Sequence, residues 1–260
     1  MKIIICLFLC LSLRAYALTC ALSIEYPPYQ YVKDGRTTGL DAKLIKLYNQ
    51  YTNEKIKMIS MKWDLALSEL YYSNKFDCIW EMEVTDARQK RYLLTKPIYK
   101  RSSTLFVHES SNIKSLNDIK YKIIVGDKDS TLEQEIKKSK KFKSTRIKHL
   151  PTKELAMKHL KQKKVSAVIM PNAVGIYLAK KLNVNIRQVF TAREKTPVAV
   201  AVKKGNEKLY QMIQETLSKI PTHEIEKIIN SSIRKTSKKV DTSYQKDTSP
   251  NLMGAYLHPF

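Results

Sequence analysis

A short apolar strand that runs into two consecutive prolines most constrains what this chain can fold into. Residues 18–24 favour a buried strand, and Pro27 and Pro28 end it because proline fixes φ and has no N–H to give to a sheet. Tyr26 and Tyr29 flank the prolines and are therefore expected at the strand's carboxyl edge. In open α/β sheets, small ligands bind at that edge.

Apolar strands and amphipathic helices then alternate along the chain. Further strands are expected over 56–60, 76–80, 104–107, 122–125, 146–150, 165–170 and 196–202. This order predicts an α/β fold with parallel sheets and right-handed crossovers. The strands fall into two lobes, and the chain is expected to cross between them near 104–108 and again near 194–199.

Small polar residues stand where the helices are expected to begin, and their side chains can accept hydrogen bonds from the free N–H groups of a first turn. The expected caps are Asp41, Thr85, Ser130, Thr152 and Asn206. Ser130 and Glu133 also have the spacing of a capping box.

The first seventeen residues have the pattern of a secretory signal peptide. Lys2 precedes an apolar run over 3–13, and Ala15-Tyr16-Ala17 provides a small-x-small cleavage site. A lipoprotein signal ending at Cys20 is an alternative, although the residues before it fit that pattern poorly. A first transmembrane helix is the other alternative, but the run is short for a bilayer.

Two cysteines remain once such a leader is removed. Cys20 and Cys78 each lie in an expected strand, and an exported protein resides in an oxidising compartment. They are therefore candidates for a disulfide. Two buried free thiols are the alternative, because the sequence does not give the distance between the α-carbons.

The chain is strongly basic, with a formal net charge of +23. Loss of Lys2 and Arg14 with the leader would lower this to +21. The charge is spread over helix faces and a polar tail over 234–260, without the interleaved aromatics or motifs of a nucleic-acid-binding protein. We expect a solvated basic surface and no nucleic-acid partner, although such a surface could lie close to acidic phospholipid headgroups.

Several short blocks occur in a characteristic order. They are Tyr26-Pro27-Pro28-Tyr29 with Gly39-Leu40-Asp41, Trp63-Asp64-Leu65, Lys75-Phe76-Asp77, the run 85–91 before Lys96-Pro97-Ile98-Tyr99, the run 113–119, and Asp129-Ser130-Thr131. Together they resemble the type II periplasmic solute-binding proteins over about 19–230, in particular the amino-acid-binding family of ABC importers.

The resemblance implies a two-lobed fold with a hinge of two crossing segments. One lobe would comprise 18–105 and 198–233, the other 106–197, with a flexible basic tail from 234. It implies a monomeric, non-enzymatic periplasmic receptor that captures a polar, amino-acid-like solute and delivers it to an ABC permease. No cofactor or metal is expected.

The resemblance also implies roles for individual residues. Arg88 matches the arginine that binds a ligand carboxylate, for which a guanidinium is well suited; a surface arginine is the alternative. Ser130 and Thr131 match the second lobe's carboxylate site at a helix start, where free N–H groups attract an anion. Tyr26 matches an aromatic that packs on the ligand, and Trp63 is a candidate for the ligand contact or for the cleft wall.

The chain also departs from the family pattern. Residues 79–85 replace a stretch that is usually rich in Ser, Gly and Thr, and Glu83 stands where a small hydroxyl residue is usual. Pro171, with Asn172 beside it, replaces the aspartate that contacts an α-amino group. Glu81 and Glu83 could replace that anionic partner, or they could pair with Arg88. These departures favour a cationic or zwitterionic solute.

Two other functions remain open. A degenerate member used for sensing or surface interaction would explain the missing aspartate and the basic tail. An enzyme that dehydrates small acids would need a general acid or base, for which Glu81 and Glu83 are the candidates.

Overall fold

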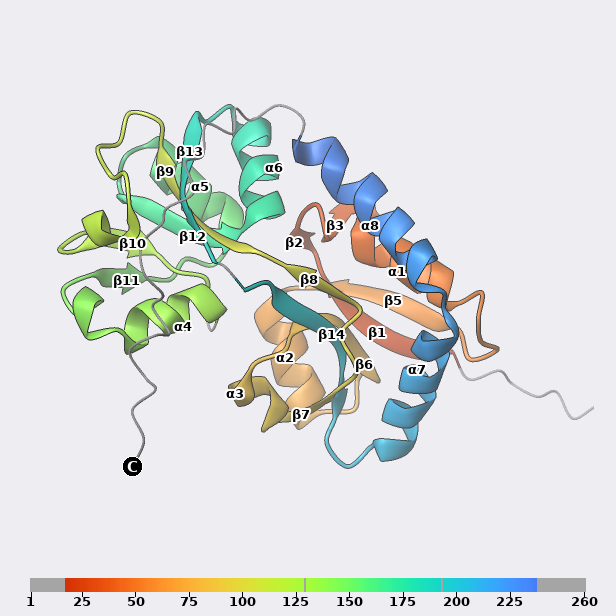
Figure 1. Cartoon of the computed structure of the whole chain (residues 1–260). Helices are drawn as coiled ribbons and strands as arrows, with labels where there is room; N and C mark the ends of the chain where they lie inside the picture. Colours follow the sequence, from red (N-terminus) through yellow and green to blue (C-terminus); the bar gives the residue numbers. More distant parts are fainter. Residues whose placement is uncertain (1–16, 129, 193, 238–260) are drawn as a thin grey trace, which may run out of the picture.

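Two sheets, each flanked by helices, lie side by side in the computed structural model, which describes residues 17–128, 130–192 and 194–237 (Figure 1). The first sheet has the order β5-β1-β6-β14-β7, and β8 also pairs with β14. Its strands are β1 (Leu18–Ser23), β5 (Ile56–Met61), β6 (Cys78–Glu83), β7 (Tyr92–Leu94), β8 (Tyr99–Arg101) and β14 (Thr196–Lys203). As expected, β1 pairs in parallel with β5 and β6, whereas β14 runs antiparallel to β6.

The second sheet has the order β11-β10-β12-β9-β13. Its strands are β9 (Ser103–His108), β10 (Ile123–Val125), β11 (Arg146–Lys148), β12 (Ala167–Pro171) and β13 (Ile186–Thr191). A third, small sheet contains β2 (Glu25–Tyr26), β3 (Gln30–Lys33) and β4 (Arg36–Thr38). These sheets and their helices form the expected two-lobed α/β architecture.

The helices cover the faces of both sheets (Figure 1). They are α1 (Leu40–Tyr48), α2 (Trp63–Tyr72), α3 (Asp86–Gln89), α4 (Thr131–Lys138), α5 (Lys153–Lys161), α6 (Asn172–Leu182), α7 (Glu207–Lys219) and α8 (Thr222–Ser237), with 3-10 turns over Leu116–Ile119 and Lys140–Phe142. None of the helices in the described ranges is both long and apolar enough to span a membrane.

The chain passes between the two sheets twice. Ser102 alone separates β8 from β9, and residues 192–195 join β13 to β14. Figure 1 shows these two crossings next to each other between the lobes. The residue ranges given above for the lobes, 18–105 with 198–233 and 106–197, stay a prediction.

A disulfide joins the two central strands of the first sheet, as the sequence indicated. Cys20 and Cys78 are register partners on β1 and β6, and their α-carbons are 4.5 Å apart. Both residues are fully buried. Trp80 packs nearby against the edge of Tyr48, with 5.8 Å between ring centroids.

The turn that carries Tyr26 and Tyr29 is fixed by the start of α1. The N–H groups of Leu40 and Asp41 donate to the carbonyls of Pro28 and Tyr29, both at 3.0 Å. Gly39 has a φ of 111°, and a Cβ there would lie 2.2 Å from the Tyr29 carbonyl oxygen. Only glycine allows this close approach.

Two of the predicted helix starts are wrong in detail. Gly39 is the N-cap of α1, and Asp41 is fully buried inside the first turn, where Tyr99 donates to its carboxylate at 3.1 Å. Ser130 caps α4 as expected, but the Glu133 carboxylate contacts Lys137 and His149 and does not complete a capping box. Thr85, Thr152 and Asn206 do cap their helices.

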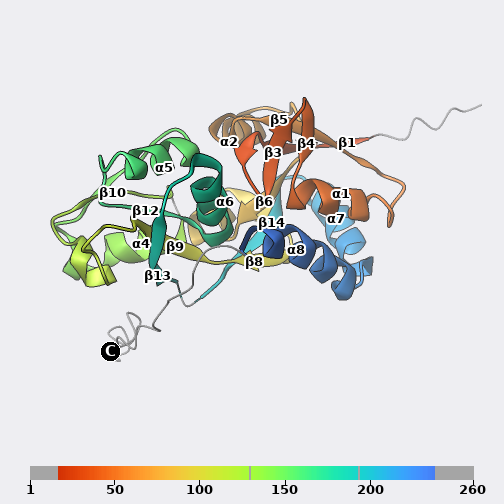
Figure 2. The ribbon, with the colours of Figure 1, turned by 90° about the horizontal axis from the view of Figure 1, so that it is seen from above.

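Helix α8 extends from the first lobe to the second and packs against α1 and α6 (Figures 1 and 2). Its isoleucines pack against the main apolar core. Two polar contacts join it to the first lobe, where Tyr51 donates to Glu224 at 2.6 Å and Lys43 donates to Ser232 at 3.0 Å. The predicted signal peptide and most of the predicted tail lie outside the described residues.

Candidate functional site

Charged side chains from both lobes meet where β8 leads into β9. Arg101 is the last residue of β8, and Glu81 and Glu83 lie on the neighbouring β6. We call Arg101, Glu81 and Glu83 the ion cluster. Together with Tyr26, Arg88 and the facing residues of the second lobe, the ion cluster forms what we call the inter-lobe site.

The guanidinium of Arg101 binds both carboxylates of the ion cluster. Its Nε donates to Glu83 Oε1 at 2.9 Å, Nη2 lies 2.8 Å from the same oxygen, and Nη1 contacts Glu81 Oε1. Arg101 is 7% exposed and each glutamate 2%. A charged group removed from water to this extent requires an opposite charge and hydrogen bonds.

A β-bulge lies beside the two glutamates. The register between β6 and β14 shifts between Ala199 and Ala201, so Trp80 and Glu81 stand opposite one residue of β14. Glu81 has a φ of 79°, which is uncommon for a residue with a side chain. Backbone strain of this kind is frequent at functional sites and is offset by surrounding contacts.

The face of the guanidinium lies on two tyrosine rings. The Arg101 Cζ is 5.0 Å from the ring centroid of Tyr26 and 5.5 Å from that of Tyr29. Tyr29 in turn stacks on Tyr99 with an interplanar angle of 2°. A cation over aromatic faces is attracted by the ring electrons, more strongly where water is excluded.

Arg88 lies at the edge of the ion cluster. Its Nη1 donates to the Glu83 carbonyl oxygen at 3.2 Å and is 3.7 Å from Glu83 Oε2. Its Cζ is 5.9 Å from the ring centroid of Trp63, the first residue of α2. Its side chain keeps 14% of its surface exposed, more than the Glu83 side chain that it contacts.

The second lobe contributes a helix start and another ion pair. Asp127 follows β10 and pairs with Lys153, the first residue of α5. Ser130 is buried and accepts from the Glu133 N–H at 3.4 Å, which caps α4. Thr131, the first residue of α4, accepts from the Thr196 hydroxyl at 3.2 Å, which ties α4 to the start of β14.

The titration of Glu83 depends on both lobes. Burial, with a smaller contribution from the negative charge of Asp127, raises its pKa to about 7 against the lowering effect of Arg88 and Lys153. The single guanidinium of Arg101 is shared with Glu81, so it does not fully neutralise two adjacent carboxylates. Glu83 is therefore a carboxyl group that takes up a proton near neutral pH.

A second buried carboxyl group supports the tyrosines. Burial raises the pKa of Asp41 to about 7, opposed by hydrogen bonds that include those from Gln30 and Tyr99. Burial also raises the pKa of Tyr29 to about 12, so this ring stays a neutral surface for a cation. The inter-lobe site thus rests on a rigid, largely desolvated base.

The structure brings most of the predicted site residues together. Glu81 and Glu83 belong to the ion cluster, Tyr26 and Arg88 contact it, and Trp63 contacts Arg88. Ser130 and Thr131 come from the facing lobe, where Thr131 contacts Thr196.

Asn172, also a predicted site residue, forms its hydrogen bonds away from the ion cluster. Its side-chain amide donates to Thr104 at 3.2 Å and to Gln188 at 2.9 Å, within the second sheet. The predicted pairing with Arg88 is present only for Glu83, at 3.7 Å, and the principal partner of both glutamates is Arg101.

Sequence reasoning missed Arg101, Asp127 and Lys153 as site residues. One signal was available for Arg101: it is two residues from Tyr99, and alternate residues of a strand face the same side. Asp127 and Lys153 gave no local signal, because they meet only through the second lobe's folding. In the described ranges, no three His, Cys, Asp or Glu side chains gather as metal ligands would.

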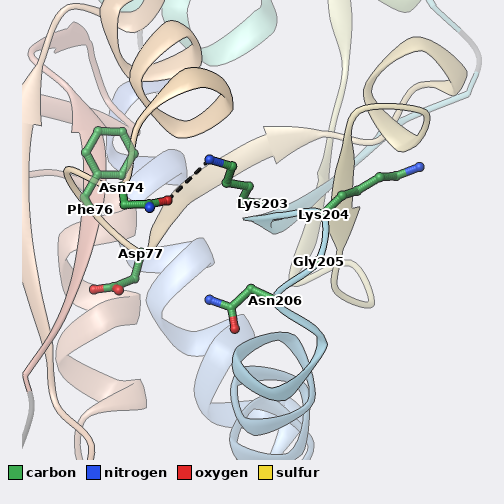
Figure 3. A pocket seen from close by; sticks show the side chains of 7 residues that line it. All are labelled: Asn74, Phe76, Asp77, Lys203, Lys204, Gly205 and Asn206. Atoms are coloured by element: carbon green, nitrogen blue, oxygen red, sulfur yellow. Dashed lines mark hydrogen bonds between the residues drawn. The ribbon is translucent and has the colours of Figure 1, made fainter.

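A polar surface hollow lies at the opposite end of the same strands (Figure 3). It has a volume of about 430 Å³ and is lined by Asn74, Phe76, Asp77, Lys203, Lys204, Gly205 and Asn206. Lys203 donates to Asn74 at 3.3 Å, and Asp77 accepts from the Thr19 N–H and hydroxyl at 2.7 and 2.8 Å. Asp77 precedes β6 and Lys203 ends β14, so the hollow is roughly 20 Å from Glu83 along the strand.

Comparison with known families gives a match over most of the chain. Residues 18–234 match the model of the bacterial extracellular solute-binding proteins, family 3. The chain is 25% identical over 162 residues to a probable amino-acid-binding protein, YxeM, of Bacillus subtilis, covering 62% of this chain and 61% of that protein. It is 22% identical over 199 residues to the L-cystine-binding protein TcyJ of Escherichia coli K12, covering 75% and 74% respectively.

A solved structure shows the same architecture. An ancestral arginine-binding protein bound to glutamine superposes with a TM-score of 0.73 at 25% identity, covering 83% of this chain and 96% of that one.

Proposed function

Because this chain belongs to the bacterial extracellular solute-binding proteins, family 3, we propose that it captures a small zwitterionic, amino-acid-like solute at the inter-lobe site. The solute is then delivered to an ABC permease from the periplasmic side of the membrane. The observation that supports this most directly is that the two lobes touch beside these charged groups, where the Thr196 hydroxyl of β14 donates to Thr131 of α4 at 3.2 Å.

Each end of a zwitterion has a candidate partner. Arg88 is partly exposed at the edge of the ion cluster and can bind a carboxylate through two parallel hydrogen bonds. The first turn of α4, which begins at Thr131, presents the positive end of the helix dipole to the same carboxylate from the other lobe, while the Ser130 N–H donates to the Asp127 carbonyl at 2.8 Å. Asp127 is an acidic candidate for the ammonium group, in place of the aspartate that Pro171 replaces.

Contacts from both lobes would couple binding to closure. A solute that contacts both Arg88 and α4 binds more tightly to the closed arrangement of the lobes than to an open one. Binding therefore shifts the equilibrium toward the closed state by this difference in affinity. Ser102 and residues 192–195 are the short segments that would absorb the hinge motion.

We propose a receptor without catalytic activity. A dehydratase would need a carboxyl group that is free to transfer a proton to its substrate. Glu81 and Glu83 both contact Arg101, which holds them against the protein.

A sensing or interaction protein is the second candidate. It is favoured by one observation: the ion cluster is largely neutralised by an arginine of the chain, so the lobes can meet without a solute. Such a protein would need no permease.

A thermal-shift panel of zwitterionic amino acids separates the two functions. A solute at about 100 times its Kd stabilises the folded state by about 2.7 kcal/mol, which corresponds to a rise in Tm of about 5–10 °C for a protein of this size. Arg88→Gln should at least halve the shift at the same solute concentration, while the control Lys203→Gln, in the distant hollow, should keep it. No shift with any member of the panel would overturn the receptor and favour the sensing protein.

A further inference from the structure

We propose that the Arg101 side chain occupies the place where a solute's cationic side chain would otherwise bind. It thereby excludes solutes with such side chains from the inter-lobe site. This rests on the proposed location of the solute site. Arg101 thereby becomes a specificity-determining residue, one that none of the predicted ligand contacts included.

The surroundings of the Arg101 guanidinium are those of a recognition site for a guanidinium ion. Two carboxylates bind its edge, and the rings of Tyr26 and Tyr29 cover its face. Charged hydrogen bonds combined with aromatic faces are the means by which proteins bind an external guanidinium. Here the bound guanidinium is not an external ligand but the side chain of Arg101.

The backbone holds Arg101 in this position. Arg101 pairs with Thr196 in the ladder between β8 and β14, one residue before the crossing to the second sheet. A group tethered in this way competes as if present at millimolar or higher concentration. A free cation would also have to displace a guanidinium that is 7% exposed and has both partners in place.

The charges that remain define the solute that is accepted. Arg101 offsets part of the negative charge of Glu81 and Glu83, and Lys153 offsets part of that of Asp127, which leaves Asp127 able to meet an ammonium group. Arg88, by contrast, is 3.7 Å from Glu83 Oε2 and partly exposed, so it is the cation best able to meet a solute carboxylate. The site should therefore prefer a short zwitterion to a solute with a long cationic side chain.

Removing the Arg101 side chain should create a site for the missing fragment. Arg101→Ala deletes the equivalent of ethylguanidinium, and this compound should then raise the Tm of the variant in a saturable manner. Ethylguanidinium should leave the wild-type Tm unchanged, because its place is occupied. Ethylammonium, which cannot form the forked hydrogen bonds, should act more weakly.

Two variants serve as controls. Arg101→Ala combined with Glu83→Gln removes one carboxylate of the ion cluster and should lose the response to ethylguanidinium. Arg187→Ala removes a partly buried arginine in the second lobe, where Nη2 donates to the carbonyls of Ser111 and Ile113 at 2.8 and 2.9 Å. The response of Arg187→Ala to ethylguanidinium measures any general effect of guanidinium salts on the Tm.

Binding of L-arginine tests the proposal even if Arg101→Ala does not fold. By calorimetry, Arg101→Gln should bind L-arginine at least tenfold more tightly than the wild type does. Equal binding of L-arginine to the wild type and the variant would overturn the proposal, as would a folded Arg101→Ala that does not respond to ethylguanidinium. Neither result affects the wild-type panel of zwitterions, so failure of this proposal is distinguishable from failure of the proposed function.

Discussion

Strands β6 and β14 carry charged residues at both ends, and the two ends differ in their exposure to water. At the inter-lobe end, Glu81 and Glu83 are buried with Arg101. At the other end, Asp77 and Lys203 line an open hollow and form local hydrogen bonds with Thr19 and Asn74. Charged residues of the same types should therefore contribute differently to stability. A buried charge that loses its partner is strongly destabilising, whereas a charge in contact with water is not.

The largest expected difference between the two ends is in stability. Arg101→Ala should lower the free energy of unfolding by about 3–5 kcal/mol, because it leaves two buried carboxylates without their cation. Urea denaturation at pH 7.5 measures this change. Replacing the ion cluster as a unit, with Arg101→Met, Glu81→Gln and Glu83→Gln, should recover much of the lost stability. If Arg101→Ala is as stable as the wild type, the two ends of the strands do not differ in this respect.

The disulfide stabilises β6 near its solvent-exposed end, since Cys78 directly follows Asp77. Replacing both Cys20 and Cys78 by serine should lower the free energy of unfolding by about 2–4 kcal/mol, mainly because the unfolded chain regains freedom. Reductant should lower the Tm of the wild type but not that of the double variant. If the reductant lowers the Tm of both proteins equally, the loss of stability does not come from reduction of the disulfide.

The buried carboxyl groups should make the protein less stable as the pH rises. Folding raises the pKa of Asp41 and of Glu83 to about 7, so between pH 5 and pH 7.5 the folded state holds protons that the unfolded state has lost. The free energy of unfolding therefore falls across this window. Asp41→Asn should reduce the slope, and thermal unfolding at several pH values measures it; a Tm that rises over this range would contradict the expectation.

The smallest effect is expected in the hollow. Lys203→Ala removes a half-buried cation whose contacts with the Ser73 carbonyl and with Asn74 are long, at 3.4 and 3.3 Å, so the free energy of unfolding should change by less than about 0.5 kcal/mol. The same urea titration serves here. A loss comparable to that of Arg101→Ala would mean that the two ends of the strands do not differ as described.

Local sequence patterns predicted much of the fold. Alternating apolar strands and amphipathic helices predicted the α/β architecture, and Thr85, Thr152 and Asn206 were correctly expected to cap helices because capping depends on neighbouring residues. Asp41 was misjudged because its partner, Tyr99, is distant in the sequence. A buried tertiary hydrogen bond took precedence over a local cap.

The inter-lobe site was predicted only in part. Tyr26 and Arg88 were singled out by their places in short motifs and Glu83 by its departure from the family pattern, and the structure brings the three into one site. The role of Arg101 depends on the pairing of β8 with β14 and on the bulge at Glu81, neither of which has a local signature. Long-range strand register determined which cation the glutamates bind.

Calorimetric titration of the best zwitterion from the panel into the wild type and Arg88→Gln tests the central claim most directly. Loss of a bidentate charged contact to the solute carboxylate should weaken binding by about 10- to 100-fold, or roughly 1.5–3 kcal/mol. Equal affinities in the two proteins would show that Arg88 does not bind the solute and would contradict the account.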